Sequence, residues 1–152
     1  MTKYAIDTNL YIRALRDEEA AAGLERFLSE HAPRSYLHSV VLHELLVGAA
    51  TARGVATIEN EIARPLERRR RLVTPSHRSW QDAGAALAQL ASAKKLELQS
   101  VPRSFVHDAL IAASCGEAGV TLVTENGRDF SRLRTVLRFD YVAPWPTGDA
   151  GS

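Results

Sequence analysis

Val120-Thr-Leu-Val-Thr-Glu-Asn-Gly-Arg-Asp129 contains the clearest strand of the chain, followed directly by a polar turn. Residues 120–124 are all β-branched or apolar, which favours an extended strand, whereas Asn, Gly and Asp are typical of turns. A helical pattern at 105–118 stops at Gly119, immediately before this strand. A strand entered from a helix in this way is typical of a parallel sheet whose strands are joined by helices.

The same alternation of strand and helix continues along the whole chain. Pro65 should end or kink the helix in which it falls. We therefore expect one domain over residues 1–145, an α/β sandwich around a mostly parallel central sheet, and a flexible tail over 146–152. The predicted strands are 3–7, 35–38, 72–74, 120–124 and 139–142, and the predicted helices are 9–16, 17–30, 39–52, 55–70, 80–90 and 105–118.

The composition is that of an ordinary globular protein of 152 residues, with 45% hydrophobic and 24% charged residues. A net charge of +1 gives no overall field that would attract a nucleic acid. Lysine, however, occurs only at positions 3, 94 and 95, so nearly all of the 19 basic residues are arginines. Arginine binds phosphate in a bidentate fashion, which suits RNA, and a GC-rich genome that favours arginine codons is the alternative explanation.

The single cysteine, Cys115, cannot form an internal disulfide, and its place in an alanine-rich helix predicts a core residue. The N-terminus lacks the apolar stretch of a signal peptide, and no window approaches the ~18 consecutive apolar residues of a membrane span. We therefore expect a soluble protein of the reducing cytoplasm, with no membrane partner. One cysteine and five scattered histidines give no zinc-ligand spacing.

Four acidic residues stand where the chain changes from one predicted element to the next. In open parallel sheets, sites collect beyond the carboxyl ends of the strands. Carboxylates that converge there are costly to bury unless something positive, most economically a hard divalent cation, compensates them. Together they predict a metal-dependent enzyme. They are Asp7 at the end of a strand, Glu44 within an apolar helix, Asp108 near the start of a helix and Asp129 just after a strand.

Each acid also has an ordinary structural explanation. Glu44 shares a helix face with three valines and could pair with a buried Arg or His. Asp108 in the first turn of a helix, and Asp7 just before one, are at positions where aspartate is favoured for capping. Asp129 lies in a stretch rich in turn formers, where an exposed Asp is common. The four in combination are more specific than any one of them.

Polar neighbours of these acids could complete a site. Thr8, Asn9, Thr124 and Asn126 flank the acids in sequence and could orient the carboxylates or bind a bridging water. Thr124 and Asn126 are otherwise ordinary turn residues.

Two further features are open to two interpretations. His43 and His107 each precede one of the acids, and a general-base role stands against ordinary hydrogen bonding. The run Arg68-Arg-Arg-Arg71 could bind RNA phosphates or form a solvated helix end that the helix dipole stabilises.

In these residues, the chain resembles the PIN-domain ribonucleases and, more specifically, the VapC-type toxins of prokaryotic toxin–antitoxin pairs. The resemblance covers nearly the full length, although residues from about 50 to 100 match only in pattern. Its matching segments are AIDTNLYI (5–12), LHELLVGA (42–49), HDALIAASCGEAGVTLVT (107–124), TENGRDF (124–130) and FDYVAPW (139–145).

This resemblance implies a PIN-like three-layer α/β/α sandwich. Its catalytic and metal-binding acids would be Asp7, Glu44, Asp108 and Asp129, with Mg²⁺ or Mn²⁺ as the cofactor. Some relatives carry an additional acid where this chain has Asn126. The resemblance further implies hydrolysis of RNA to products with 5′-phosphate and 3′-hydroxyl ends, a homodimer, and a cognate antitoxin as partner.

RNA that approaches a cluster of carboxylates also needs basic residues around it. Arg13, Arg103 and Arg128 are the RNA-binding candidates nearest to the acids in sequence. An apolar groove for the antitoxin, or simply core packing, would account for Leu10, Tyr11, Leu15, Leu45 and Leu46.

Two other functions remain open from the sequence. An aspartyl phosphatase would use Asp7 as its nucleophile and would normally need a second acid two residues on, where this chain has Asn9. A non-catalytic PIN-like module for RNA binding or assembly would not need all four acids, which this chain retains. Metal-dependent loss of a labelled RNA distinguishes the nuclease from both.

Overall fold

The computed structural model describes residues 1–147, and its strands form one five-stranded sheet. The strand order is β3-β2-β1-β4-β5, and every neighbouring pair is parallel. This confirms the predicted parallel sheet. The strands are β1 (Lys3–Ile6), β2 (Ser35–His38), β3 (Leu72–Val73), β4 (Val120–Val123) and β5 (Tyr141–Val142).

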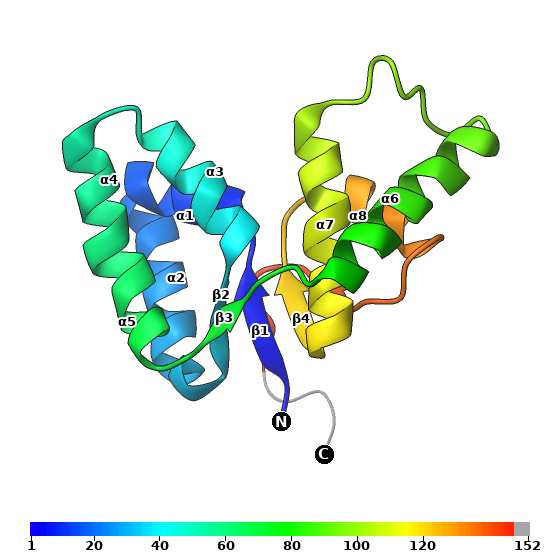
Figure 1. Ribbon diagram of the computed structural model, residues 1–152. Coiled ribbons are helices and arrows are strands. Elements are labelled where there is room, and N and C mark those ends of the chain that lie inside the picture. Colours follow the sequence, from blue (N-terminus) through cyan, green and yellow to red (C-terminus); the bar gives the residue numbers. More distant parts are fainter. Residues whose placement is uncertain (148–152) are drawn as a thin grey trace.

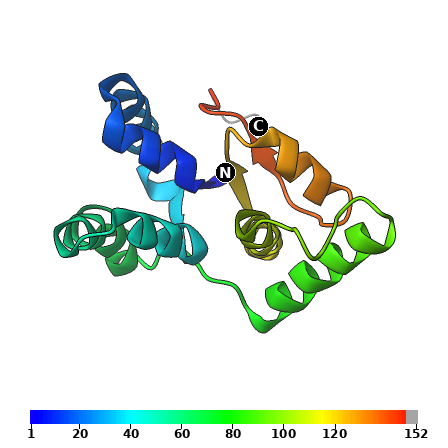
Figure 2. The ribbon, with the colours of Figure 1, turned by 90° about the horizontal axis from the view of Figure 1, so that it is seen from above.

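Helices connect the strands and cover both faces of the sheet. Figure 2 shows α1 and α2 on one side of β1 and β4, with α6 and α7 on the other side (Figure 1). The predicted three-layer α/β/α sandwich is therefore confirmed. The helices are α1 (Thr8–Arg16), α2 (Glu18–Glu30), α3 (Ser39–Ala49), α4 (Ala52–Ile58), α5 (Arg64–Arg68), α6 (His77–Ser92), α7 (Arg103–Ala118) and α8 (Gly127–Arg134), with short turns at Ala32–Arg34 and Glu59–Ala63.

The core is centred on β1, β4 and α7. Ile6 and Leu122 are no more than 1% exposed, and Ile111 on α7 is fully buried against them. Cys115 is also fully buried, which confirms the predicted core role of the cysteine. Because the inner face of α7 is tightly packed in the core, a polar side chain on that face has little freedom to move.

The register between β1 and β4 fixes where the two strands deliver their next residues. Ile6 pairs with Val123, and the backbone N–H of Asp7 donates to the carbonyl of Val123 over 2.9 Å. Asp7 and Thr124 therefore leave the sheet side by side at its carboxyl edge. Because β1 and β4 are adjacent, the polar residues that follow them can contribute to the same site.

Two local predictions differ from the structure. The helix predicted at 55–70 is not one regular α-helix: α4 ends at Ile58, a π-helical turn covers Glu59–Ala63, and α5 begins at Arg64. Pro65 lies in the first turn of α5, where a backbone N–H is not needed. The polar stretch after β4 is not a simple turn: Asn126 caps a further helix, α8, whose Phe130 and Leu133 are fully buried. Tertiary packing thus overrides strong turn residues here.

No helix among residues 1–147 has the length and apolar character to cross a membrane. The chain remains packed close to the end of the described part, since Trp145 stacks on Phe27 with ring centroids 5.1 Å apart. Most of the tail predicted at 146–152 lies outside the described residues, so its flexibility stays a prediction.

Candidate active site

Asp7 is 4% exposed at the end of β1. It is the N-cap of α1: its Oδ1 accepts the backbone N–H of Thr8 over 2.9 Å, and its Oδ2 accepts the hydroxyl of Thr124 over 2.7 Å. Burial raises the pKa of Asp7, the two hydrogen bonds partly lower it, and repulsion from Glu44 raises it again. Capping α1 therefore holds the Asp7 carboxylate at the edge of the sheet. This structural role is compatible with a role in a site.

Asp108 is 7% exposed on the inner face of α7. Because α7 begins at Arg103, Asp108 lies beyond the first turn, and the prediction of a place in the helix's first turn is wrong. Burial, followed by repulsion from Asp7, Glu44 and Asp129, raises the pKa of Asp108 to about 8. The ionised form of the Asp108 carboxyl group is therefore strongly disfavoured in the folded protein.

Glu44 projects from α3, and its side chain is 23% exposed. Its Oε1 accepts the hydroxyl of Thr8 over 2.8 Å, and its Oε2 lies 3.6 Å from Nδ1 of His107. The structural alternative, a pair with a basic residue, is thus present through a half-buried histidine. It does not remove Glu44 from the acidic group, because Thr8 ties the same carboxylate to the residue that follows Asp7.

Asn126 lies between two of the acids. Its Nδ2 donates to Oδ2 of Asp129 over 3.2 Å and reaches Oδ2 of Asp108 at 3.4 Å. Its own backbone N–H donates to the Thr124 hydroxyl over 2.9 Å, so Thr124 connects Asn126 with Asp7. Asp129 lies in the first turn of α8, and its Oδ1 is 3.5 Å from Arg132. Asn126 thus stands closer to the buried acids than the sequence indicated.

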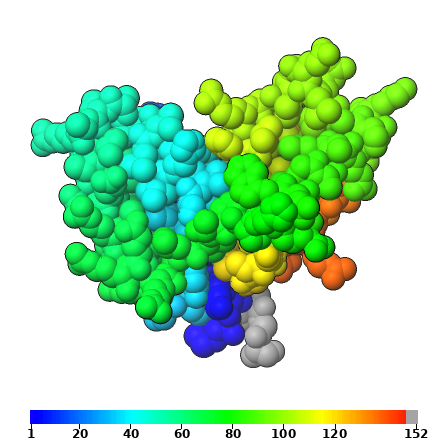
Figure 3. All heavy atoms as spheres, viewed as in Figure 1, coloured from blue at the N-terminus to red at the C-terminus, as the bar shows by residue number. Residues whose placement is uncertain are grey.

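Three of the four predicted acids line one hollow, and the fourth, Asp129, lies behind Asn126. Figure 3 shows the molecule notched between the α3 side and the α7 side. A cavity of about 300 Å³ lies there and is lined from four elements or their ends, by Asp7, Thr8, Asn9, Glu44, Ser104, Asp108 and Asn126. Asp129 and Thr124 do not line it. They stand behind Asn126 and Asp7, which they hold through hydrogen bonds.

A hydrated divalent cation fits this donor set. Among residues 1–147, neither Asp7 nor Asp108 forms an ion pair with Lys, Arg or His, so both buried carboxylates lack a compensating positive charge. Within the same described part, no three Asp, Glu, His or Cys side chains are arranged to enclose an ion between them. Mg²⁺ does not require such a cage, because it keeps several waters and takes one or two carboxylates directly.

The basic residues predicted to bind RNA differ in their surroundings. Arg13 forms an ion pair with Glu125, and Arg128 is exposed on α8. Arg103 lines a second cavity that adjoins the acidic one. The run 68–71 precedes β3, and because all strands are parallel it lies at the edge of the sheet opposite to the acids. That run is therefore not part of the same binding surface.

Sequence reasoning missed Ser104 as a residue of the site. Ser104 lies four residues before Asp108, one turn earlier on the same face of α7, and lines the acidic cavity. Helical spacing from Asp108 would have found it. The sequence left His43 as either a general base or an ordinary hydrogen-bonding histidine. In the structure its ring centroid lies 5.7 Å from that of His107.

Comparisons with known proteins agree with this architecture. The family model described as PIN domain matches residues 4–136. No similar sequence was found among curated proteins. Among solved structures, the DNA-bound VapBC of Salmonella typhimurium is similar with a TM-score of 0.69 and 24% identity, over 94% of this chain and 98% of that one.

Two further solved structures have the same fold. FitAcB of Neisseria gonorrhoeae matches with a TM-score of 0.67 and 18% identity, over 93% of this chain and 98% of that chain. VapBC-1 of nontypeable Haemophilus influenzae matches with a TM-score of 0.62 and 16% identity, again over 93% and 98%. At sequence identities below 25%, these similarities show a shared fold alone.

Proposed function

This chain belongs to the PIN domain family, whose members are nucleases, and from that premise we propose that it is a metal-dependent endoribonuclease acting as the toxin of a toxin–antitoxin pair. The observation that carries the proposal is the pair of buried carboxylates, Asp7 and Asp108, which stand at the carboxyl edge of the sheet and have no cationic partner among residues 1–147. Burying two such groups is costly, and a bound cation offsets that cost.

Asp7 and Asp108 would hold the cation, either Mg²⁺ or Mn²⁺, directly. Glu44 and Asn126 line the same cavity and would bind the waters that the ion keeps, while Asp129 acts through Asn126. When bound, a divalent cation makes a water nucleophilic at neutral pH and offsets the charge that develops on the phosphate and on the leaving oxygen.

The chain's own residues supply orientation. The Thr124 hydroxyl and the Thr8 amide fix the two oxygens of Asp7, and the Thr8 hydroxyl fixes one oxygen of Glu44. The carboxylates are thereby held in place before the substrate arrives, which limits reorganisation during the reaction. Arg103 at the rim, with Arg13 and Arg128 further out, would bind RNA phosphates that the carboxylates alone would repel.

The partner side of the proposal rests on the solved relatives. The similar structures are complexes named VapBC and FitAB, from which we infer a cognate antitoxin and, with the family resemblance, a homodimer in the cytoplasm. The apolar groove suggested by the sequence needs correction, because Leu10, Tyr11 and Leu45 are buried in the core. Of the five residues proposed for it, only the exposed Leu15 and the partly buried Leu46 could face a partner.

Cleavage of labelled single-stranded RNA tests the proposal. Wild-type protein with Mg²⁺ should cut the RNA and leave 5′-phosphate ends, and EDTA should stop the reaction. Asp7→Asn should reduce the rate by at least about a hundredfold, the order expected when a positioned group of a metal site is removed. Asp82→Asn, which changes an exposed acid on α6, is the matched control and should cut normally. Undiminished cleavage in EDTA or by Asp7→Asn would contradict the proposal.

A further inference from the structure

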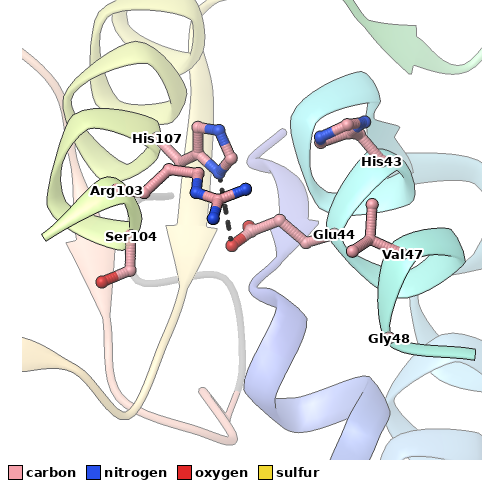
Figure 4. A pocket seen from close by; sticks show the side chains of 7 residues that line it. All are labelled: His43, Glu44, Val47, Gly48, Arg103, Ser104 and His107. Carbon is pink, nitrogen blue, oxygen red and sulfur yellow. Dashed lines mark ion pairs between the residues drawn. The ribbon is translucent and has the colours of Figure 1, made fainter. Parts of the chain in front are cut away.

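A second cavity, which we call the histidine cavity, adjoins the acidic one between α3 and α7 (Figure 4). It has a volume of about 260 Å³ and is lined by His43, Val47 and Gly48 on α3 and by Arg103, Ser104 and His107 on α7. Glu44 and Ser104 line both cavities, so the two lie side by side. A polymer whose phosphate occupied the acidic cavity would pass directly into this one.

The histidine cavity offers surfaces for a flat ring. The rings of His43 and His107 meet edge to face, with centroids 5.7 Å apart and an angle of 81° between their planes. His43 is an exposed residue, so its ring is accessible to a further ring. Val47 adds an apolar surface, since it is 64% exposed on the same side of α3. Nucleic-acid bases stack on aromatic rings and contact apolar side chains in this manner.

The histidine cavity is lined by basic side chains besides Glu44, whereas the acidic cavity is lined by carboxylates. Arg103 and His107 extend from α7 toward the side chain of Glu44 (Figure 4), and the Nδ1 of His107 is 3.6 Å from the Glu44 carboxylate. Glu44 is therefore shielded on the histidine side, where the exposed Arg103 presents a guanidinium that can bind a phosphate. A nucleotide, with its base and its phosphate, matches this combination.

We propose that the histidine cavity is a binding subsite for one unpaired nucleotide of RNA, the neighbour of the phosphate at the acidic cavity. The base stacks on the exposed ring of His43, meets the nearly perpendicular ring of His107 at its edge and contacts Val47, and the phosphate that flanks it binds Arg103. This inference rests on the proposed nuclease function and adds a determinant of sequence preference to it. The cavity volume, near the lower end of small-molecule sites, admits a base that has left its stack and excludes a paired duplex.

Gly48 permits a test that spares the fold. A Cβ at Gly48 meets no atom within 4 Å, so a side chain there projects into open space and fills the histidine cavity. Leucine is also a better helix former than glycine, so Gly48→Leu should fold. Gly84 on α6 is the matched control, because a Cβ there also meets nothing within 4 Å and Gly84 lines neither cavity.

Cleavage of a random-sequence, single-stranded RNA library with Mg²⁺ gives the first readout. Sequencing the ends should reveal a base preference at one position beside the cut for wild type and for Gly84→Leu. Gly48→Leu and His43→Ala should lose that preference and raise KM roughly tenfold, the effect expected for one stacked base, while kcat changes little. A preference and KM equal to wild type in both variants would overturn the subsite.

Binding gives a second readout that does not depend on catalysis. A fluorescent, short single-stranded RNA is titrated with Asp7→Asn protein, alone and combined with Gly48→Leu or Gly84→Leu, in the presence of Mg²⁺. Gly48→Leu should weaken binding roughly tenfold and Gly84→Leu should not. Equal binding by all three overturns the subsite even if wild type cuts RNA. A selective loss with Gly48→Leu supports it even if wild type cuts none, in which case only the nuclease proposal fails.

Discussion

The surroundings of Asp108 change the pKa of its carboxyl group and, with it, the stability of the fold. Its raised pKa arises from burial first and from three neighbouring carboxylates second. In the absence of a cation, the folded protein holds a proton on Asp108 that the unfolded chain would release at neutral pH. The free energy of unfolding therefore falls as pH rises from about 4 to 8, because the unfolded chain gains the ionised form that the folded site disfavours. A bound cation, or an uncharged side chain at this position, should restore that stability.

Asp108→Asn should stabilise the protein in EDTA. The folded-state pKa of about 8 exceeds the ordinary value of 3.8, so the wild type loses stability as pH rises through that interval, and the uncharged Asn does not. We expect a gain on the order of 2 kcal/mol near pH 8, measured by urea unfolding, since each pKa unit corresponds to about 1.4 kcal/mol and local relaxation reduces the full effect. A variant less stable than wild type across the whole interval would show that burial and repulsion do not disfavour the ionised carboxyl group here.

Thr124→Val should impair the site without unfolding the protein. The Thr124 hydroxyl donates to Asp7 and accepts the amide of Asn126, so valine leaves both without their partner. We expect the Mg²⁺ concentration for half-maximal RNA cleavage to rise about 10- to 100-fold. Thr124→Ser, which retains the hydroxyl, is the control and should resemble wild type. If Thr124→Val and Thr124→Ser had the same Mg²⁺ requirement, the orienting role of this hydroxyl would be refuted.

Local sequence signals single out two of the four acids. Asp7 ends an apolar strand, and Glu44 interrupts an apolar helix face. Ser104 was not predicted as a site residue because nothing in its own segment marks it, and for His43 the sequence left a general-base role and ordinary hydrogen bonding open. They line cavities only because α3 and α7, far apart in sequence, meet beside β1 and β4.

At the scale of elements, α3 depends on an unusual cap. His38 ends β2, is fully buried, and accepts the backbone N–H of Val40 at its Nδ1 over 3.0 Å. Its Nε2 has no hydrogen-bond partner among the described residues. Burial lowers the pKa of His38 to about 4, because the charged ring would lose its hydration and its capping acceptor. The helix that carries Glu44 is therefore tied to a neutral histidine.

His38→Asn should make the protein less sensitive to acid. The folded-state pKa of about 4 is below the ordinary 6.5, so wild type loses stability as pH falls through 6.5 toward 4, when the unfolded chain takes up the proton. Asn retains a capping oxygen and has no such titration. Urea unfolding at several pH values should show the stability difference between wild type and variant shrinking as pH falls. A constant difference over that interval would contradict the assignment.

The elements predicted well are those with a strong hydrophobic pattern. The parallel strands and the long helices followed from apolar runs and their stops, with boundaries close to those observed for α7 and β4. α8 was missed because Asn126 and Gly127 are strong turn residues, whereas Phe130 and Leu133 stabilise the helix through burial in the core. Only tertiary structure supplies that contact.

At the scale of the whole molecule, the fold separates its charges between two edges of one sheet. The acids gather at the carboxyl edge, where β1 and β4 end next to each other, and the arginine run 68–71 lies at the other edge. A net charge of +1 conceals this division. This separation follows from the parallel direction of the strands, because the run 68–71 precedes β3 whereas Asp7 and Asp129 follow β1 and β4. The strand order, which puts β1 beside β4, is what alternation alone does not determine.

The most direct test of the account is where a cation binds. Crystals soaked in Mn²⁺ and measured at the manganese absorption edge should show an anomalous peak in the acidic cavity, within about 2.3 Å of carboxylate oxygens of Asp7 and Asp108. The peak should disappear in Asp108→Asn crystals soaked in the same way. A wild-type cavity without manganese, or a peak that contacts neither Asp7 nor Asp108, would contradict the central claim.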